Sequence, residues 1–307
     1  MRCPAVSVIM SVYNTGRILR ETIASVIAQT FADFELLIVD DGSTDEITQD
    51  ILADQNDHRI RIIRQRNAGV AAARNRGIAE ARGEYLAFLD HDDIFMPDKL
   101  AALKECLDKS PRTAVVYSPV VPFGECSAAA LSLPPLRGEC YSTLLRRNLI
   151  YSVSCIMVRT EFLSAHHVTF DPGCVPCDDW DFHLQCAVFG EMTMFDRPLV
   201  GYRMHRGNQS ADRVSMYEAG IRTVKKHLRN VSAVSAVTGI PKRRIRAAGR
   251  YALAEHLYGL GRQDLAAGRR ISALVHCIIA FTCDPMVFLS RCASFLRRRL
   301  SGSGIRS

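Results

Sequence analysis

The chain has 307 residues and a formal net charge of +7, and its composition is 48% hydrophobic and 23% charged. These proportions are ordinary for a globular chain with a sizeable core, and the length allows one large domain with an appendage. The sequence has no internal repeat and no long low-complexity tract, which excludes a repeat protein.

Short apolar runs alternate with amphipathic stretches through the first part of the chain. The runs are rich in β-branched residues and end in turn-forming residues, as buried strands do. The predicted strands are 6–12, 35–39, 60–64, 85–89 and 114–118. The predicted helices are 18–27, 69–81 and 98–110, and Ser43 and Thr44 can start another one after the second strand. This alternation predicts an α/β fold with a mostly parallel, doubly wound sheet, which binds ligands at the carboxyl ends of its strands.

Acidic residues follow the fourth predicted strand, in the sequence Asp90-His91-Asp92 with Asp93 beside it. Two carboxylates so close together repel each other unless something positive neutralises them, and oxygen ligands in an open cleft suit Mg²⁺ or Mn²⁺. The alternative is a polar turn with Asp98 as the cap of the next helix, because Asp is common where strands end. On its own the motif leaves both interpretations open.

Four motifs at the predicted strand ends carry a more specific signal. They are SVIMSVYN at 7–14, VDDGSTD at 39–45, NAG at 67–69 with ARNRG at 73–77, and FLDHDD at 88–93. In this order and spacing they resemble glycosyltransferase family 2, whose members are inverting enzymes of the GT-A fold. The resemblance covers about the first 120 residues and its later motifs end near Ser210.

The resemblance implies a nucleotide-sugar donor site. Ser11 and Tyr13 would line the nucleoside pocket, and Asp41 would read the base, because its carboxylate can accept a hydrogen bond from an imide N–H. Arg74, on the helix that Gly69 opens, would contact the nucleotide. The alternative for Arg74 is an ordinary solvated helix arginine.

The same resemblance assigns roles to the acidic motif. Asp90 would lie near the ribose, and Asp92 would be the direct metal ligand. The implied cofactor is Mn²⁺ or Mg²⁺, which would offset the charge on the leaving diphosphate as a Lewis acid. His205, in the sequence Tyr202-Arg203-Met204-His205, matches a further family element and is a candidate for binding the metal or donating to a diphosphate oxygen.

A transferase also needs a base for the acceptor hydroxyl. The sequence Cys177-Asp178-Asp179-Trp180-Asp181 resembles the family's acidic stretch at a helix start, in which the second acid, here Asp179, is the general base. Inversion by direct displacement requires only one such carboxylate. The alternative is that these acids stabilise the helix through its dipole, and we favour that interpretation for Asp178 and Asp181.

The cysteines predict a reducing location. Eleven cysteines is an odd number, and no secretory leader is visible, so we expect reduced, intracellular thiols. Cys174 and Cys177 could form a redox centre or half of a zinc site, but no second pair follows at zinc spacing. A loop with two thiols is the interpretation we favour.

We expect three regions. Residues 1–118 would form the nucleotide-sugar-binding half of the GT-A domain, 119–210 its acceptor-binding and catalytic half, and 211–307 a helical, basic C-terminal extension. Within the second region, Pro and Gly residues predict a loop over 119–138, and 152–158 predicts a strand that returns to the core.

The basic character belongs to the last part of the chain. Residues 241–307 contain thirteen Lys or Arg and three Asp or Glu, a net charge of +10, whereas the rest of the chain carries −3. The segment 271–289 is apolar, but His276, Asp284 and Pro285 interrupt it, so we do not expect a spanning helix.

Residues 286–300 combine apolar side chains with four arginines, as a helix on an anionic membrane surface would. The side chains expected to insert are Phe288, Phe295 and Leu296. The alternative is a packed amphipathic helix with a solvated arginine end. Nucleic-acid binding is disfavoured because no recognised module is present.

The sequence therefore predicts a metal-dependent inverting glycosyltransferase. The resemblance favours a UDP-sugar donor and a saccharide or lipid-linked acceptor in cell-surface polysaccharide synthesis, on the cytoplasmic side, with peripheral attachment to the inner membrane face as a further expectation. The alternative is a catalytically silent nucleotide-sugar-binding protein. A GxGxxG turn is absent after the first strand, which disfavours a dinucleotide oxidoreductase.

Overall fold

The computed structural model describes residues 3–125, 135–138 and 140–300. It divides into two compact units. Unit 1 comprises Met1–Tyr141 and Asn148–Gly207, and unit 2 comprises Ser142–Arg147 and Asn208–Ser307.

The centre of unit 1 is an eight-stranded sheet with the strand order β3-β2-β1-β4-β9-β6-β10-β8. All neighbours in it are parallel except that β9 is antiparallel to β4 and β6, and β8 to β10. The strands are β1 (Val6–Val12), β2 (Phe34–Asp40), β3 (Ile60–Arg64), β4 (Tyr85–Asp90), β6 (Thr113–Tyr117), β8 (Arg137–Gly138), β9 (Ile156–Arg159) and β10 (Glu191–Met194). The mostly parallel, doubly wound sheet is thereby confirmed.

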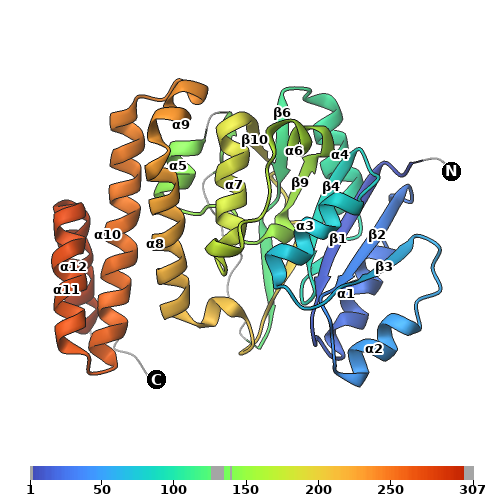
Figure 1. The fold of residues 1–307 in the computed structure, drawn as a ribbon, viewed down its shortest axis with the longest axis horizontal. Helices are drawn as coiled ribbons and strands as arrows, with labels where there is room; N and C mark the ends of the chain where they lie inside the picture. Colours follow the sequence, from blue (N-terminus) through green and yellow to red (C-terminus); the bar gives the residue numbers. More distant parts are fainter. Residues whose placement is uncertain (1–2, 126–134, 139, 301–307) are drawn as a thin grey trace. The chain divides into compact units, whose positions relative to one another are not determined.

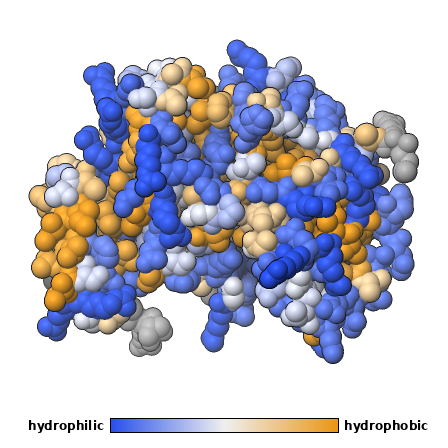
Figure 2. Space-filling model, viewed as in Figure 1, coloured by the Kyte–Doolittle hydropathy of each residue, from blue (hydrophilic) through white to orange (hydrophobic). Residues whose placement is uncertain are grey.

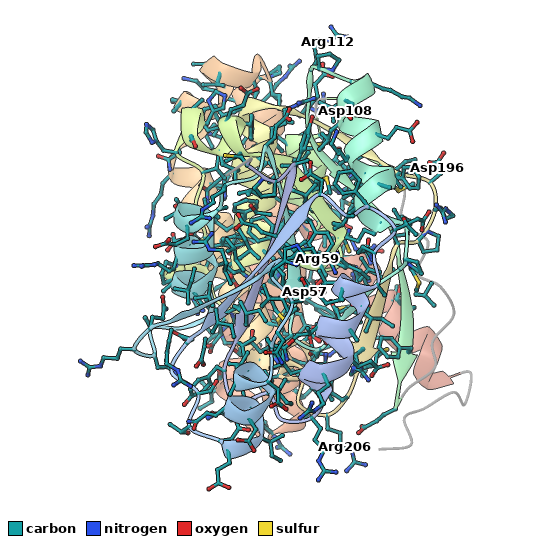
Figure 3. All side chains as sticks on the ribbon, turned by 90° about the vertical axis from the view of Figure 1, so that its right-hand side faces the viewer. Asp57, Arg59, Asp108, Arg112, Asp196 and Arg206 are labelled. Atoms are coloured by element: carbon teal, nitrogen blue, oxygen red, sulfur yellow. The ribbon has the colours of Figure 1, made fainter. Side chains whose placement is uncertain are left out.

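Helices cover both faces of this sheet, which is why β1 and β2 are buried along their whole length and are mostly apolar in sequence. In Figure 1, α3, α6 and α7 lie in front of the sheet, whereas α1 and α4 lie behind it, and Figure 3 shows the same two layers edge-on. The helices are α1 (Ile18–Ile27), α2 (Glu46–Ala53), α3 (Val70–Glu80), α4 (Lys99–Lys109), α6 (Thr160–His166) and α7 (Asp178–Phe189).

Two helix starts differ from expectation. The cap of α2 is Asp45, whose side chain accepts a hydrogen bond from the N–H of Thr48 at 2.8 Å, and not Ser43 or Thr44. The side chain of Asp98 makes no capping hydrogen bond to α4 and instead forms an ion pair with Arg197.

A second sheet of unit 1 has the order β5-β11-β7, formed by β5 (Ile94–Phe95), β11 (Val200–Met204) and β7 (Val120–Gly124). The prediction of a continuous loop over 119–138 is therefore wrong at β7 and β8, whereas 126–134 and 139 lie outside the described residues. Pro122 is tolerated within β7 because that strand lies at the sheet edge and pairs only with β11.

The predicted strand 152–158 is correct only in its second half. Its first half is a 3₁₀ turn, η1 (Val153–Cys155), because the Ser152 hydroxyl accepts a hydrogen bond from the N–H of Ser154 at 3.0 Å and tightens the chain there. The strand β9 begins only at Ile156.

Unit 2 is helical. Its elements are α5 (Tyr141–Arg146), η3 (Gln209–Ala211), α8 (Arg213–Arg229), α9 (Val231–Thr238), α10 (Lys242–Ala266), α11 (Arg270–Cys283) and α12 (Pro285–Leu300), with the first residue of α5 in unit 1. The long helix α10 packs against α8, α11 and α12. Leu257 and Tyr258 of α10 and Ala280 of α11 form a buried cluster. Within the described part of the chain, no helix has the length and apolarity needed to cross a bilayer.

Candidate active site

The predicted donor motifs converge at the carboxyl ends of β2, β1 and β4. In the sheet register Ser11 of β1 lies opposite Val39 of β2 on one side and Asp90 of β4 on the other. Ser11 is buried, whereas Tyr13, just beyond the strand, is 47% exposed. Strand order reverses around β1, and this is where open α/β sheets bind ligands.

Asp41 is buried and shapes the turn that starts α3. Its Oδ1 accepts hydrogen bonds from Gln65 Nε2 (2.8 Å) and the N–H of Ala68 (2.9 Å), and its Oδ2 accepts one from the N–H of Gly69 (2.8 Å). Gly69 has φ +90°, a value that favours glycine. Because a carboxylate has about four acceptor positions, these three hydrogen bonds leave one position on Asp41.

Arg74 of α3 is buried and bridges two carboxylates. Its Nη2 donates to Oδ1 of Asp90 and its Nη1 to Oδ2 of Asp178, both at 2.6 Å. Burial lowers the pKa of Arg74, but the charges of Asp90 and Asp178 outweigh this effect and raise the pKa above its usual value. A solvated helix arginine is thereby excluded for Arg74. Its neighbour Arg76 fits that description, with an exposed ion pair to Glu80.

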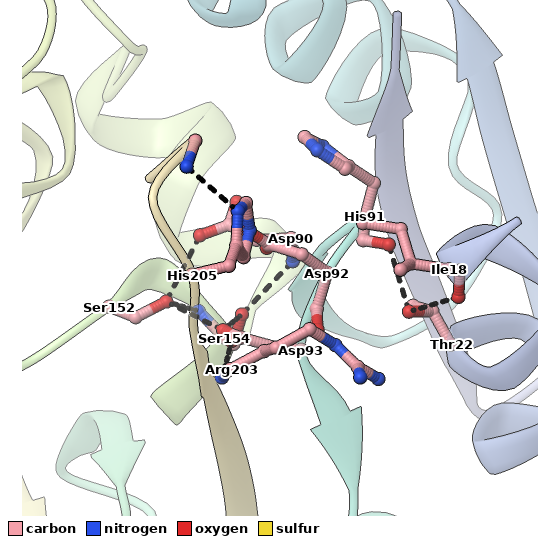
Figure 4. A network of polar contacts seen from close by, with 11 residues as sticks. Ile18, Thr22, Asp90, His91, Asp92, Asp93, Ser152, Ser154, Arg203 and His205 are labelled. Carbon is pink, nitrogen blue, oxygen red and sulfur yellow. Dashed lines mark hydrogen bonds and ion pairs between the residues drawn. The ribbon is translucent and has the colours of Figure 1, made fainter. Parts of the chain in front are cut away.

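The two predicted metal ligands lie side by side. His205, which follows β11, places Nε2 2.9 Å from Oδ2 of Asp92 (Figure 4). The His205 Nδ1 accepts a hydrogen bond from the N–H of Gly207, so in a neutral ring Nε2 carries the hydrogen and donates to Asp92. A carboxylate and a neutral imidazole fit Mn²⁺ or Mg²⁺, and His205 would ligate through Nε2 in the tautomer that carries its hydrogen on Nδ1, which gives up the hydrogen bond from Gly207.

The third acid of the motif, Asp93, anchors the turn. It is buried and accepts hydrogen bonds from the Ser154 hydroxyl (2.6 Å), the Ser152 hydroxyl (3.3 Å) and the N–H of Arg203 (3.1 Å). Burial, and then the charges of the neighbouring acids, raise the pKa of Asp93 well above its usual range. Figure 4 shows the contacts of Asp93 with the two serines and with Arg203.

Sequence reasoning gave Ser152, Ser154 and Arg203 no role at the site. The Ser152 oxygen also lies 3.1 Å from Oδ2 of Asp90, so its single hydrogen is shared between Asp90 and Asp93, and Arg203 Nε donates to the carbonyl of Asp92 at 2.8 Å. The sequence did contain one indication of a polar role: Ser152 and Ser154 alternate with other residues just before β9. Hydroxyl groups next to the start of a strand often form hydrogen bonds with nearby backbone.

Asp179 stands in the first turn of α7 and is half-buried. Its Oδ1 accepts a hydrogen bond from the N–H of Trp180 at 2.6 Å. Burial, and then the charge of Asp178, raise the pKa of Asp179 to about 7, against the lowering effect of Arg74. A carboxyl group with such a pKa is suited to general-base work near neutral pH.

The neighbouring acids of α7 have different roles. Asp178 is buried in its ion pair with Arg74, so the interpretation of Asp178 as only a helix-stabilising acid is wrong. The reason is that its partner comes from α3 and no local pattern reveals it. Asp181 is also buried, and its Oδ2 accepts a hydrogen bond from Gln185 of the same helix at 2.7 Å, in keeping with a structural role.

Cys174 and Cys177 are buried cysteines on either side of a cis Val175–Pro176 peptide bond. Among the described residues, potential ligand atoms of Asp171, Cys174 and Asp181 lie within 4.8 Å of one another. Asp171 also accepts a hydrogen bond from the N–H of Gly173 and thereby caps η2 (Pro172–Cys174). This group is distinct from the predicted pair Asp92 and His205.

This architecture and the acidic strand ends define an α/β transferase domain of the GT-A type. The chain belongs to glycosyltransferase family 2: the family model named Glycosyl transferase family 2 matches residues 7–166, more than half of the chain. A relative from Nostoc sp., described as an uncharacterized glycosyltransferase, is 31% identical over 249 residues, which cover 73% of this chain and 74% of the relative. The chain thus contains a domain of this family.

Another similar protein is an uncharacterized glycosyltransferase of Rickettsia felis, 52% identical over 95 residues. This match covers 31% of the chain but only 16% of that relative's length. The chain therefore corresponds to a small part of this longer relative.

Two solved structures share the fold. TarS of S. aureus, residues 1–349 in complex with UDP-GlcNAc, has a TM-score of 0.66 and 16% identity, covering 94% of this chain and 92% of that one. The mannosyltransferase PcManGT from Pyrobaculum calidifontis, in complex with GDP-Man and Mn²⁺, has a TM-score of 0.64 and 18% identity, covering 98% and 81%. The predicted GT-A fold is confirmed by these similarities.

Proposed function

We propose that the protein is an inverting, metal-dependent glycosyltransferase that transfers a sugar from a UDP-sugar to a saccharide or lipid-linked acceptor in cell-surface polysaccharide synthesis. The observation that carries the proposal is the bridge of Arg74 between Asp90 and Asp178. It links the donor motif at the end of β4 to the helix that carries Asp179, so donor and base sides belong to one polar network within unit 1.

Asp179 is proposed as the general base. It would take the proton of the acceptor hydroxyl while that oxygen bonds to the anomeric carbon, and the nucleoside diphosphate would leave from the opposite face. A single displacement of this kind inverts the anomeric configuration and needs no second carboxylate. The raised pKa of Asp179 supports this role. A carboxylate with a higher pKa is a stronger base, and it therefore removes the proton of the acceptor hydroxyl more readily.

Asp92 and His205 are proposed to hold the divalent cation. When bound there, Mn²⁺ or Mg²⁺ would neutralise the charge that develops on the leaving diphosphate. Asp93 keeps Asp92 in place from behind, since the Asp93 carboxyl joins the acidic turn to Ser154 and to the backbone of β11. The metal ligands are thereby held in place before the donor binds, so they need not rearrange when it does.

The nucleoside would lie over Ser11 and Tyr13, with Asp41 as the acceptor for the base. Support for UDP comes from the family resemblance and from the TarS complex with UDP-GlcNAc, whereas the PcManGT complex contains GDP-Man. We propose a cytoplasmic location, which the odd number of eleven cysteines supports, because they cannot all pair with one another and reduced thiols are typical of that compartment.

A thermal-shift panel tests the donor assignment. We expect UDP with Mn²⁺ to raise the unfolding temperature more than GDP with Mn²⁺ does, and a chelator to abolish most of that rise, because a ligand stabilises the state that it binds. Equal stabilisation with chelator present would contradict a metal-assisted site.

A turnover assay separates the enzyme from a silent binding protein. Release of UDP from UDP-sugars, screened over several sugars without added acceptor, should be detectable for the wild type and lost in Asp179→Asn. Binding of UDP without any turnover, with or without saccharide acceptors, would favour the silent binding protein.

A further inference from the structure

Helix α11 is amphipathic in the reverse sense to an ordinary surface helix. Its polar side chains face Asp264 of α10, which is buried: Ser272 Oγ donates to Asp264 Oδ2 at 2.5 Å, and His276 Nδ1 lies 2.8 Å from the same oxygen. Arg269, just before α11, pairs with the other oxygen of Asp264. The polar face of α11 is thus used inside unit 2, and its opposite face is left to the outside.

That opposite face is apolar. We call it the α11 stripe: Ile271, Leu274, Val275, Ile278 and Ile279. These positions follow the i, i+3, i+4, i+7, i+8 spacing of one helix face. Ile271 is 82% exposed, Leu274 61% and Ile278 54%. Met286 and Leu289 at the start of α12 are exposed as well, and Figure 2 shows hydrophobic surface over α11 and α12.

The predicted role of 286–300 as the inserting helix needs correction at Phe288. Its ring packs edge-on against Tyr258 and Phe281, and it is partly buried against the cluster of Leu257, Tyr258 and Ala280. Phe295 lies under the guanidinium of Arg262, and the side chain of Leu296 lies outside the described residues. The large exposed apolar side chains are therefore concentrated on α11 rather than on α12.

The segment that carries the stripe is cationic in the sequence, although Arg269 and Arg291 pair with Asp264 and Glu255 of α10. Residues 265–300 contain six arginines and a single acid, Asp284. Arg270 is exposed at the start of α11, and three further arginines close α12 in the sequence. An apolar face with a cationic surround matches a bilayer surface with anionic headgroups, in which apolar side chains enter the acyl boundary and cations remain among the phosphates.

We propose that the α11 stripe is a docking surface for an anionic phospholipid bilayer, with α11 lying in the plane of the interface. The helix has 14 residues, about 21 Å, and is too short to cross a hydrocarbon core of about 30 Å. A second copy of the chain is a poorer occupant, because a two-fold interface through this stripe would bring like-charged arginines together. This inference is independent of the proposed catalytic chemistry.

Vesicle flotation with the full chain tests the proposal. Vesicles of phosphatidylglycerol and phosphatidylcholine in equal parts should bind the protein at low salt, and vesicles of phosphatidylcholine alone should bind it much less. High salt should weaken binding through screening. Ile278→Glu should weaken partitioning about 10- to 100-fold, since it removes one buried apolar side chain and adds a repelled charge.

Val237→Glu is the matched control, because Val237 is 55% exposed on α9 and outside the stripe. It should leave vesicle binding unchanged, and both variants should keep the wild-type unfolding temperature. The proposal is overturned if wild-type protein ignores anionic vesicles at low salt, or if Ile278→Glu binds them as well as wild type does. It is also overturned if sedimentation shows a dimer that Ile278→Glu dissociates while vesicles bind neither form.

A second measurement covers the case in which Ile278→Glu fails to fold. The chain has one tryptophan, Trp180, which is buried in unit 1 and gives a constant background. Leu274→Trp should show a blue-shifted emission with anionic vesicles, and Val237→Trp should not. The absence of a shift for Leu274→Trp would overturn the proposal.

Discussion

The guanidinium of Arg74 lies 2.6 Å from a carboxylate oxygen of Asp178, although 104 residues separate the two along the chain. Its other nitrogen holds Asp90, so one buried cation compensates two acids at the centre of the site. Removal of the Arg74 guanidinium would leave two carboxylates without a counter-charge at a poorly solvated site, which destabilises the folded state.

We predict that Arg74→Ala lowers the free energy of unfolding by about 3–5 kcal/mol, the usual effect of leaving a buried charge without its partner. Arg74→Lys should restore only part of this, because an ammonium lacks the planar fork that reaches both acids. Urea unfolding measures both. Arg76→Ala is the control, since its exposed pair with Glu80 contributes at most about 0.5 kcal/mol.

Asp179→Asn should reduce turnover by about 10²–10⁴-fold, the usual contribution of a positioned general base, while the affinity for UDP stays near that of the wild type. Steady-state kinetics and a UDP titration separate the two. Glu46→Gln removes an acid from the first turn of α2 and controls for a generic helix-dipole effect. A loss of turnover in Glu46→Gln as large as that in Asp179→Asn would contradict the catalytic assignment.

The pH dependence of turnover should report the same group. Because a base works in its deprotonated form, kcat should rise with pH through about 7, the pKa of Asp179. The rising limb should be absent from the residual activity of Asp179→Asn. A wild-type profile that is flat between pH 5.5 and about 8.5 would contradict the role.

The contribution of Asp179 to the stability of the protein should fall with rising pH, whereas kcat rises. The folded pKa of Asp179 lies above its ordinary value of 3.8, so its contribution to stability is present below about pH 4 and is lost as pH rises through about 7. Asp179→Asn stays neutral and should therefore match the wild type at pH 4 and exceed it above pH 7. After screening at this half-buried site we expect about 1–2 kcal/mol, measured by thermal unfolding across pH.

The metal assignment predicts a selective loss. Asp92→Asn should remove most turnover and abolish the Mn²⁺-dependent stabilisation by UDP, which at about 100 times Kd is about 2.7 kcal/mol in a functional site. His205→Ala should weaken the same response. His91→Ala is a control from the same motif, because its ring points away from Asp92 in Figure 4. Unchanged Mn²⁺ dependence in Asp92→Asn would remove it from the metal site.

Local pattern predicted much of the fold because the central strands are buried on both faces. The residues of β1, β2 and β4 form mostly apolar runs, and each run ends in acidic or turn-forming residues. The proximity of Asp92 to His205 was also expected, but only through the family resemblance, since β4 and β11 belong to different sheets.

The remaining site contacts depend on strand order, which local pattern does not encode. Ser154 meets Asp93 because β9 inserts between β4 and β6, and nothing in the serines indicates that neighbour. Likewise, the sequence shows an apolar stripe on α11, but the side that faces α10 is decided by the buried carboxylate of Asp264. In both places a polar tertiary contact overrides what periodicity alone suggests.

The reversed direction of β9 separates two tasks along a single strand. Because it runs opposite to β4, the residues that precede it reach the acidic turn, whereas Arg159 at its end donates to the carbonyls of Thr113 and Leu107. A protein engineer could therefore tune the active site by redesigning the entrance to β9. Changes at its last residue, Arg159, would alter the stability of the other edge of the sheet and not the active site.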